Sequence, residues 1–383
     1  MKRYRFMRMS GCVGTVMHAV LLLLVALSVT PFAVAEEGCD APQTVCAWTG
    51  RIVGIKTPNM IASGTILENG YIVTNRHVAE DHPRLLTRDE EGGIVAAVPQ
   101  SHPVSVDLVL LRPEGVERAP AVSPIQRGDE TPQQLYVVAF DQGRNGPRVY
   151  QPGNWAVYPA DGASPQARIH TDARALPGNS GGAVVDRSGT LVGILASGDG
   201  RISEVIPVDH IASVAAATSD KHADSFKRTG MAIRQCADAL YDAAAVARDP
   251  SAEMVTKIEQ SCAASRNKQL FDQAGQTFGR WWMFDLSRRF LERSLALDPD
   301  SPNSLMSMAV TLHLDRDMAA ELPILKRYIE INPSNPQALR MAVQVAGNLG
   351  DRAFANDVLE LMRRHNPAAL PLAESFLEQA FGG

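Results

Sequence analysis

The pattern of apolar and polar residues divides the chain into a first half typical of β-strands and a helical second half. Up to Val208 the chain contains apolar, β-branched runs and turn-forming residues that indicate strands, and these signals stop after it. Ala62–Leu67 and the run beginning at Tyr71 are predicted to be strands joined by an Asn69-Gly70 hairpin turn. Two further strands are predicted at Arg51–Thr57 and Val106–Leu111.

The second half has apolar residues at helical spacing. From about Asp224 the chain is rich in Ala, Arg and Leu. Asp224–Arg248 and Ser251–Ala264 are predicted to form a helical hairpin, which would occupy most of a connector at residues 219–266. Trp281 and Trp282 lie beyond it. We interpret both as helix-packing residues, with peptide binding as the alternative.

An internal repeat follows the hairpin. Pro299, Pro333 and Pro367 each follow an Asp or Asn, and both intervals between them are 34 residues. This is the period of the tetratricopeptide repeat, in which each unit is a pair of helices. We expect such repeats over residues 267–383, with residues 370–383 as a capping helix. The alternative is an ordinary helical bundle in which the prolines coincide.

Residues 1–35 have the composition of an export signal. Basic residues precede the apolar run Val13–Val29, and Ala33-Val34-Ala35 would be the cleavage site before Glu36. The alternative is an uncleaved membrane anchor, because the run approaches the length that spans a bilayer. We expect a periplasmic or secreted protein that has no membrane span after cleavage.

Cleavage at that point would leave an acidic chain with an even number of cysteines. Removing four positive charges and no negative charge changes the formal net charge from −5 to −9, which disfavours nucleic acid as a partner. The remaining cysteines are expected to form disulfides in an exported protein. Three pairings are possible, and closeness in sequence favours Cys39–Cys46 and Cys236–Cys262. The cysteines lack metal-ligand spacing, and we expect no metal site.

The most informative motif surrounds Ser180. Gly178, Gly181 and Gly182 would allow a tight turn and a close approach of substrate to the backbone. The amides of Gly178 and Ser180 could then stabilise the oxyanion of a tetrahedral intermediate, with Ser180 as the nucleophile. Taken alone, the motif could also be a simple glycine turn.

A serine nucleophile needs a base and a group that orients the base. His77 ends an apolar run, and Asp107 is a single acid at the head of an apolar strand, where it would be costly without a partner. The order His77, Asp107, Ser180 is that of the chymotrypsin arrangement. His82, His102, His170 and His210 have no comparable context, and we interpret them as structural.

The residues around His77, Asp107 and Ser180, together with their order and spacing, resemble the HtrA-like branch of the trypsin-like (chymotrypsin-fold) serine proteases. The matching segments cover roughly residues 45–215 and are Ser63–Val78, Val106–Leu108, Thr171–Gly182 and Gly189–Ile194. The resemblance implies an all-β double-barrel protease domain over residues 36–218, ahead of the all-α helical solenoid. It also implies a serine endopeptidase without a cofactor, acting on protein or peptide substrates.

Two positions test how far the resemblance extends. Arg174 stands where trypsin-like proteases have the floor of the specificity pocket, and there it would favour an acidic substrate side chain. The alternative is that Arg174 faces solvent. Arg51-Ile52 looks like a zymogen cleavage site, but Asn179 replaces the acid that such activation requires, so we predict no zymogen activation.

Other functions remain open. The repeat region could bind a substrate or a partner protein, in the place where HtrA proteins usually carry PDZ modules. The chain could then be a protease-fold scaffold with little or no catalysis. It could also be an esterase that uses the same triad.

Overall fold

The computed structural model describes residues 39–58, 60–103, 106–116, 134–158, 168–198 and 201–382. The expected export signal at residues 1–35 lies outside these ranges. Among the helices in these ranges, none is both long enough and apolar enough to cross a membrane.

The first β lobe is a closed antiparallel barrel of six strands in the order β1-β2-β3-β6-β5-β4. Its core is built by the inward-facing apolar residues of those strands, including Ile55, Ala97 and Leu111. Ile52 is buried at the start of β1, as the strand interpretation of this segment predicted. The strands are β1 (Ile52–Lys56), β2 (Ile61–Ile66), β3 (Ile72–Thr74), β4 (Leu85–Arg88), β5 (Ile94–Pro99) and β6 (Val109–Pro113).

The second β lobe is a seven-stranded antiparallel sheet in the order β8-β7-β11-β12-β13-β10-β9. Over the described residues its ladder does not close, so the expected double-barrel domain is seen here as one closed barrel followed by a seven-stranded sheet. A single antiparallel bridge joins Leu135, at the start of β7, to Gly153, two residues before the edge strand β9. The strands are β7 (Leu135–Asp141), β8 (Gly146–Val149), β9 (Trp155–Tyr158), β10 (Arg168–Thr171), β11 (Ala183–Asp186), β12 (Leu191–Gly198) and β13 (Ser203–Pro207).

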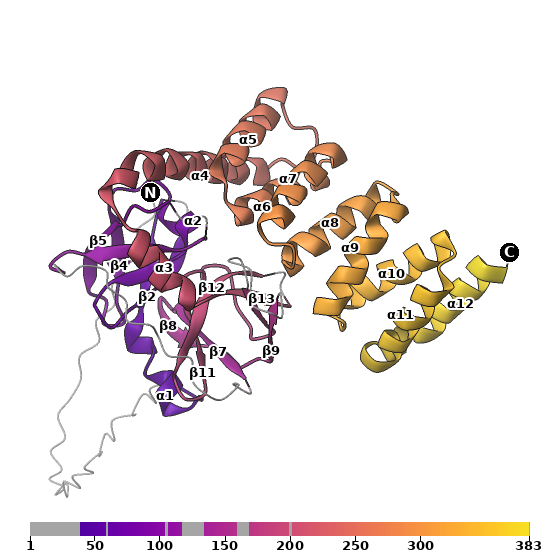
Figure 1. Ribbon diagram of the computed structural model, residues 1–383, viewed down its shortest axis with the longest axis horizontal. Coiled ribbons are helices and arrows are strands. Elements are labelled where there is room, and N and C mark those ends of the chain that lie inside the picture. Colours follow the sequence, from indigo (N-terminus) through magenta and orange to yellow (C-terminus); the bar gives the residue numbers. More distant parts are fainter. Residues whose placement is uncertain are drawn as a thin grey trace, which may run out of the picture. The chain divides into compact units, whose positions relative to one another are not determined.

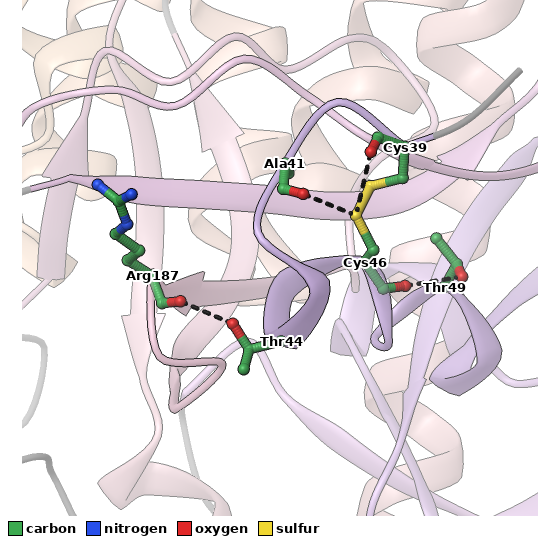
Figure 2. The surroundings of a disulfide bond; sticks show 6 residues. All are labelled: Cys39, Ala41, Thr44, Cys46, Thr49 and Arg187. Carbon is green, nitrogen blue, oxygen red and sulfur yellow. Dashed lines mark hydrogen bonds between the residues drawn. A yellow bond between two sulfur atoms is a disulfide. The ribbon is translucent and has the colours of Figure 1, made fainter.

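The segment before β1 is attached to the turn between β11 and β12. It contains the short helices α1 (Gln43–Cys46) and η1 (Thr49–Arg51), and a disulfide joins Cys39 to Cys46 (Figure 2). Thr44 Oγ1 donates a hydrogen bond to the Arg187 carbonyl at 2.8 Å, and Trp48 Nε1 donates to the Gly189 carbonyl at 2.9 Å. The sequence-favoured Cys39–Cys46 pair therefore lies in an ordered segment.

From residue 209 onward the chain is helical (Figure 1). A disulfide between Cys236 and Cys262 joins α4 and α5 as the predicted hairpin. Among the remaining helices, every second one begins 34 residues after the previous one: α6, α8, α10 and α12 start at residues 268, 302, 336 and 370. The helices are α3 (Asp209–Ala217), η2 (Asp220–His222), α4 (Ala223–Ala244), α5 (Ala252–Ser265), α6 (Lys268–Arg280), α7 (Phe284–Leu297), α8 (Pro302–Leu314), α9 (Met318–Ile331), α10 (Pro336–Leu349), α11 (Arg352–His365), η3 (Pro367–Ala369) and α12 (Leu370–Gly382).

The repeated helix starts have a common chemical cause. An Asn, Ser or Asp side chain accepts a backbone N–H bond at the first turn of α6, α8, α9, α10 and α11, and Pro302 and Pro336 occupy first helical positions. The helix pairs thus carry the predicted period. Their assignment to the tetratricopeptide family stays a prediction.

The two adjacent tryptophans have different environments. Trp281 is buried, and its indole N–H donates to the Val246 carbonyl at 2.9 Å, as expected of a helix-packing residue. Trp282 is 56% exposed and has a positive φ of 63°. Its ring lies 5.2 Å from the Arg248 guanidinium carbon. The packing interpretation was therefore wrong for Trp282, because the chain turns outward after α6.

Helix α4 packs closely against α2 (Arg76–Ala79), the helical turn that follows β3. A Cβ atom on Gly230 would lie 2.3 Å from the Glu80 carbonyl oxygen and 2.8 Å from Arg76 Nη2. Arg76 is buried, lies 3.8 Å over the ring of Phe226, and donates to the Phe226 carbonyl. Glycine is therefore required at position 230 for this contact between backbones.

A buried ionic cluster joins the second β lobe to the helices. Lys268 Nζ lies 2.7 Å from a Glu204 carboxylate oxygen, and Arg168 Nη1 lies 3.3 Å from the same atom. Arg168 also pairs with Asp298 at 2.6 Å. Burial alone would raise the pKa of Glu204, but Lys268 and Arg168 hold it below its usual value. From Cys39 onward, the β lobes and the helices therefore form one compact unit.

Replacing Lys268 with Met tests this junction, because it leaves Glu204 and Asp272 as buried charges without their ammonium partner. We expect the free energy of unfolding to fall by about 3–5 kcal/mol. Lys257→Met, which breaks the exposed pair with Asp242, should cost less than about 1 kcal/mol. Urea denaturation followed by circular dichroism measures both, and equal losses would contradict the role given to the buried cluster.

Candidate functional site

Two of the predicted site residues meet at one end of the first barrel. Strands β3 and β6 are antiparallel neighbours, with Thr74 opposite Val109, so the residues just after β3 lie beside those just before β6. His77 Nδ1 is 2.7 Å from Asp107 Oδ2, and the His77 backbone N–H donates to Oδ1 at 3.0 Å. Both side chains are buried. The predicted base and its orienting acid therefore form a direct hydrogen-bonded pair.

The Asp107 carboxylate has a further donor, which comes from the helical region. Asn267 Nδ2 donates to Asp107 Oδ1 at 3.0 Å, across 160 positions of sequence. Burial alone would raise the pKa of Asp107, but His77 and Arg168 keep it below its usual value. Sequence reasoning missed Asn267. Its one local signal was that of a helix N-cap, a role it also fills by accepting from the Leu270 N–H.

The Ser180 loop has the backbone geometry that its glycines predicted. Gly178 and Gly181 have φ values of 95° and 90°, and a Cβ on Gly181 would lie 2.0 Å from the Ser63 carbonyl oxygen. Asn179 is buried and donates to the Phe140 carbonyl and to Tyr150 Oη, both at 3.0 Å. The loop is thus fixed from behind by the second β lobe.

The Ser180 hydroxyl is bonded to β12. Its Oγ donates to the Ala196 carbonyl at 3.0 Å, and within the described part of the chain it makes no hydrogen bond to His77. The Gly178 carbonyl accepts from Ser63 Oγ at 3.1 Å. The amides of Gly178 and Ser180 meet no hydrogen-bond acceptor among the described residues.

His77, Gly178 and Ser180 line one cavity of about 690 Å³. The structure thus brings the predicted base and the predicted nucleophile to a common cavity, and Asp107 is joined to it through its bond to His77, although His77 and Ser180 are not hydrogen-bonded to each other. Pro177 and Gln142 line the same side. The opposite side is formed by α4 and α6, a contribution that sequence reasoning missed.

Arg174 lies elsewhere. Its side chain is exposed, and it does not line this cavity. The interpretation of Arg174 as the floor of an acid-binding pocket is therefore corrected in favour of the solvent-facing alternative.

The other histidines have structural environments. His82 Nε2 pairs with Glu80 at 2.9 Å, and His102 packs edge-on against the Phe226 ring, with centroids 5.4 Å apart. Burial, together with nearby Arg76, lowers the pKa of His102 to about 4, and burial also lowers the pKa of His170 to about 4. Burial lowers the pKa of His210 as well. All four lie outside the cavity that contains Ser180.

Part of the chain is similar to known peptidases. Residues 62–194 match the model of the trypsin-like peptidase domain. The serine endoproteases DegS of Salmonella typhimurium and of Escherichia coli are each 29% identical to this chain over 138 residues, which is 35% of the chain and 38% and 39% of the relatives. The match therefore spans less than half the length of those relatives.

A solved serine endoprotease from Yersinia pestis is 25% identical to this chain, with a TM-score of 0.36. The match covers 49% of this chain and 66% of that one. Residues 62–194 are thus similar to the trypsin-like peptidase domain, and part of this chain is similar to part of DegS. Helices follow from residue 209 onward.

The buried histidines predict a loss of stability in acid. The unfolded chain binds a proton at each histidine near pH 6.5, whereas folded His102 and His170 bind one only near pH 4. Stability should therefore fall as the pH is lowered through this window, by up to about 3 kcal/mol for each residue. In His102→Phe the difference in unfolding free energy between pH 7 and pH 4.5 should shrink, and in the exposed-site control His365→Phe it should not. An unchanged difference in His102→Phe, measured by urea titration, would argue against neutral burial.

Proposed function

We propose that this chain is an exported serine endopeptidase that hydrolyses peptide bonds through His77, Asp107 and Ser180. The observation that carries the proposal is the 2.7 Å pair of His77 and Asp107 on the same cavity as Ser180. A buried acid bonded to an imidazole has the arrangement that activates a serine hydroxyl. The match to the peptidase family supports the same reaction.

In the proposed mechanism, Ser180 Oγ turns from the Ala196 carbonyl to His77 Nε2 when substrate enters. His77 takes the hydroxyl proton as Oγ attacks the peptide carbonyl, and Asp107 stabilises the imidazolium that forms. The Gly178 and Ser180 amides donate to the oxyanion. His77 then protonates the leaving amine. Water hydrolyses the acyl-enzyme by the same route, and none of these steps requires a cofactor.

We also propose the roles of the flanking parts. Residues 1–35 would direct the chain out of the cytoplasm and be removed, leaving residues 36–218 as the protease domain and 219–266 as a connector hairpin. Residues 267–383 would be tetratricopeptide repeats with a capping helix. The 34-residue interval between helix starts supports this assignment. The repeats would bind a partner or substrate protein.

One observation favours the alternative of a scaffold with little catalysis. The Ser180 hydroxyl is engaged with Ala196 and makes no bond to His77 in the structure. A chain that never left this arrangement would bind through its helices and hydrolyse nothing.

Replacing Ser180 with Ala separates these functions. The wild-type protein should react with a fluorophosphonate probe and cleave casein, whereas Ser180→Ala should not be labelled and should lose at least about 1,000-fold in casein turnover. Ser188→Ala, which changes an exposed serine on the β11–β12 turn, should behave as wild type. An unlabelled wild-type protein would favour the scaffold, and ester turnover without casein turnover would favour an esterase.

The bond from Asn267 to Asp107 should position the catalytic pair. Asn267→Asp keeps a good N-cap residue at the start of α6 but removes the donor and places a like charge beside Asp107. We expect kcat/KM to fall by roughly 10- to 100-fold, as for loss of a hydrogen bond to a charged group. The acidic limb of the pH–rate profile should move to higher pH, because a less stabilised carboxylate holds an imidazolium more tightly.

Asn335→Asp is the matched control. Asn335 caps α10 in the same way, by accepting from the Ala338 N–H, but it lies far along the chain from the candidate site. Its pH–rate profile should superimpose on that of the wild type. If both variants lost activity equally, with no change in the shape of the profile, Asn267 would have only a structural role.

A further inference from the structure

The cavity beside Ser180 has two walls of different origin. One wall belongs to the β lobes and carries the candidate catalytic groups. The other comprises nine residues of α4 and α6, among them Leu240, Tyr241, Gln269 and Gln273. The helical region is thus part of the site itself and not only a neighbour of it.

Three of the six α6 residues that line the cavity have amide side chains. Gln269, Gln273, Gln276 and Arg280 are spaced by four, three and four residues, so they lie on one face of the helix. The Gln269 Oε1 atom is buried and has no hydrogen-bond partner in the described part of the chain. Gln276 is held by bonds to Asn303 and Ser307. Exposed Gln273 therefore offers hydrogen-bonding capacity to a molecule in the cavity, and the buried Gln269 Oε1 would gain a partner there by rotation of its side chain.

The dimensions of this face suit an extended chain. Eleven residues separate Gln269 from Arg280, which is about 16 Å along the helix axis. An extended polypeptide covers that distance with about five residues. Because a carboxamide both donates and accepts, it can pair with the N–H and C=O groups of a main chain whatever the side chains are.

The permanent charge on the cavity lining is positive. Arg280 is its one permanently charged lining residue among those described, and the lining contains no carboxylate. The Arg280 guanidinium donates to the Ala243 carbonyl at 2.8 Å, which directs it across the space between α6 and α4. An acidic side chain of a bound peptide could pair with Arg280, and no carboxylate of the cavity lining would compete for that guanidinium.

We propose that α6 is the second wall of the substrate cleft and binds an extended polypeptide segment. Gln269 and Gln273 bind the main chain, and Arg280 favours an acidic side chain at its end of the cleft. This deepens the proposed function, on which it rests, by naming its substrate class. Because Lys268 and Asp272 fix the start of α6 through the buried ionic cluster, the wall is anchored.

The test measures peptide binding in the full-length Ser180→Ala protein, which removes the proposed nucleophile. The probe is a fluorescein-labelled, ten-residue unstructured peptide that contains one glutamate, and its Kd is read by fluorescence anisotropy. Gln269→Met/Gln273→Met replaces two amides by apolar side chains of similar size and should raise Kd about 10-fold or more, as for two lost hydrogen bonds. Gln344→Met, at an exposed glutamine of α10, should leave Kd unchanged.

A second variant tests the charge preference independently. Arg280→Glu should weaken binding of the glutamate peptide and strengthen binding of the same peptide with lysine in place of glutamate. An unchanged Kd in the double glutamine variant, or an unchanged preference in Arg280→Glu, would overturn the proposal. Fluorophosphonate labelling of the protein that retains Ser180 is a separate readout. If labelling fails while binding follows these expectations, the wall is retained and the proposed catalysis is not.

Discussion

The buried contact between Glu204 and Lys268 is the interaction on which the arrangement of the molecule depends. A carboxylate and an ammonium group removed from water are costly unless each has a partner at close range. Here Glu204 comes from β13 and Lys268 is the first residue of α6, so each buried charge has its partner on the other part of the molecule. Arg168 and Asp298 extend the same contact to the end of α7.

Asn267 immediately precedes Lys268, and this adjacency links docking to the candidate site. The same helix start that supplies the ammonium group also supplies the donor to Asp107. A displacement of α6 would therefore disturb the acid beside His77 as well as the opposite wall of the cavity. The helices and the β lobes consequently act as one unit around Ser180.

The features that sequence predicted well were those with a local cause. The Asn69-Gly70 turn, the loop around Ser180 and the regular helix starts each depend on residues close together in the chain. Asn267 and Gln269 contact site residues that are more than 80 positions away in the chain, and no local sequence pattern predicts such contacts. Arg174 was misplaced for a related reason, because position relative to a motif does not determine which way a loop side chain points.

The glycine contact between α4 and α2 has a consequence for natural variation. His77 lies on α2, while α4 carries Leu240 and Tyr241 of the cavity wall. Only a hydrogen atom fits between position 230 and the Glu80 carbonyl. Even alanine there would force α4 away from α2, so the smallest side chain in proteins sets the distance between the helix that carries His77 and the helix that lines the opposite part of the cavity.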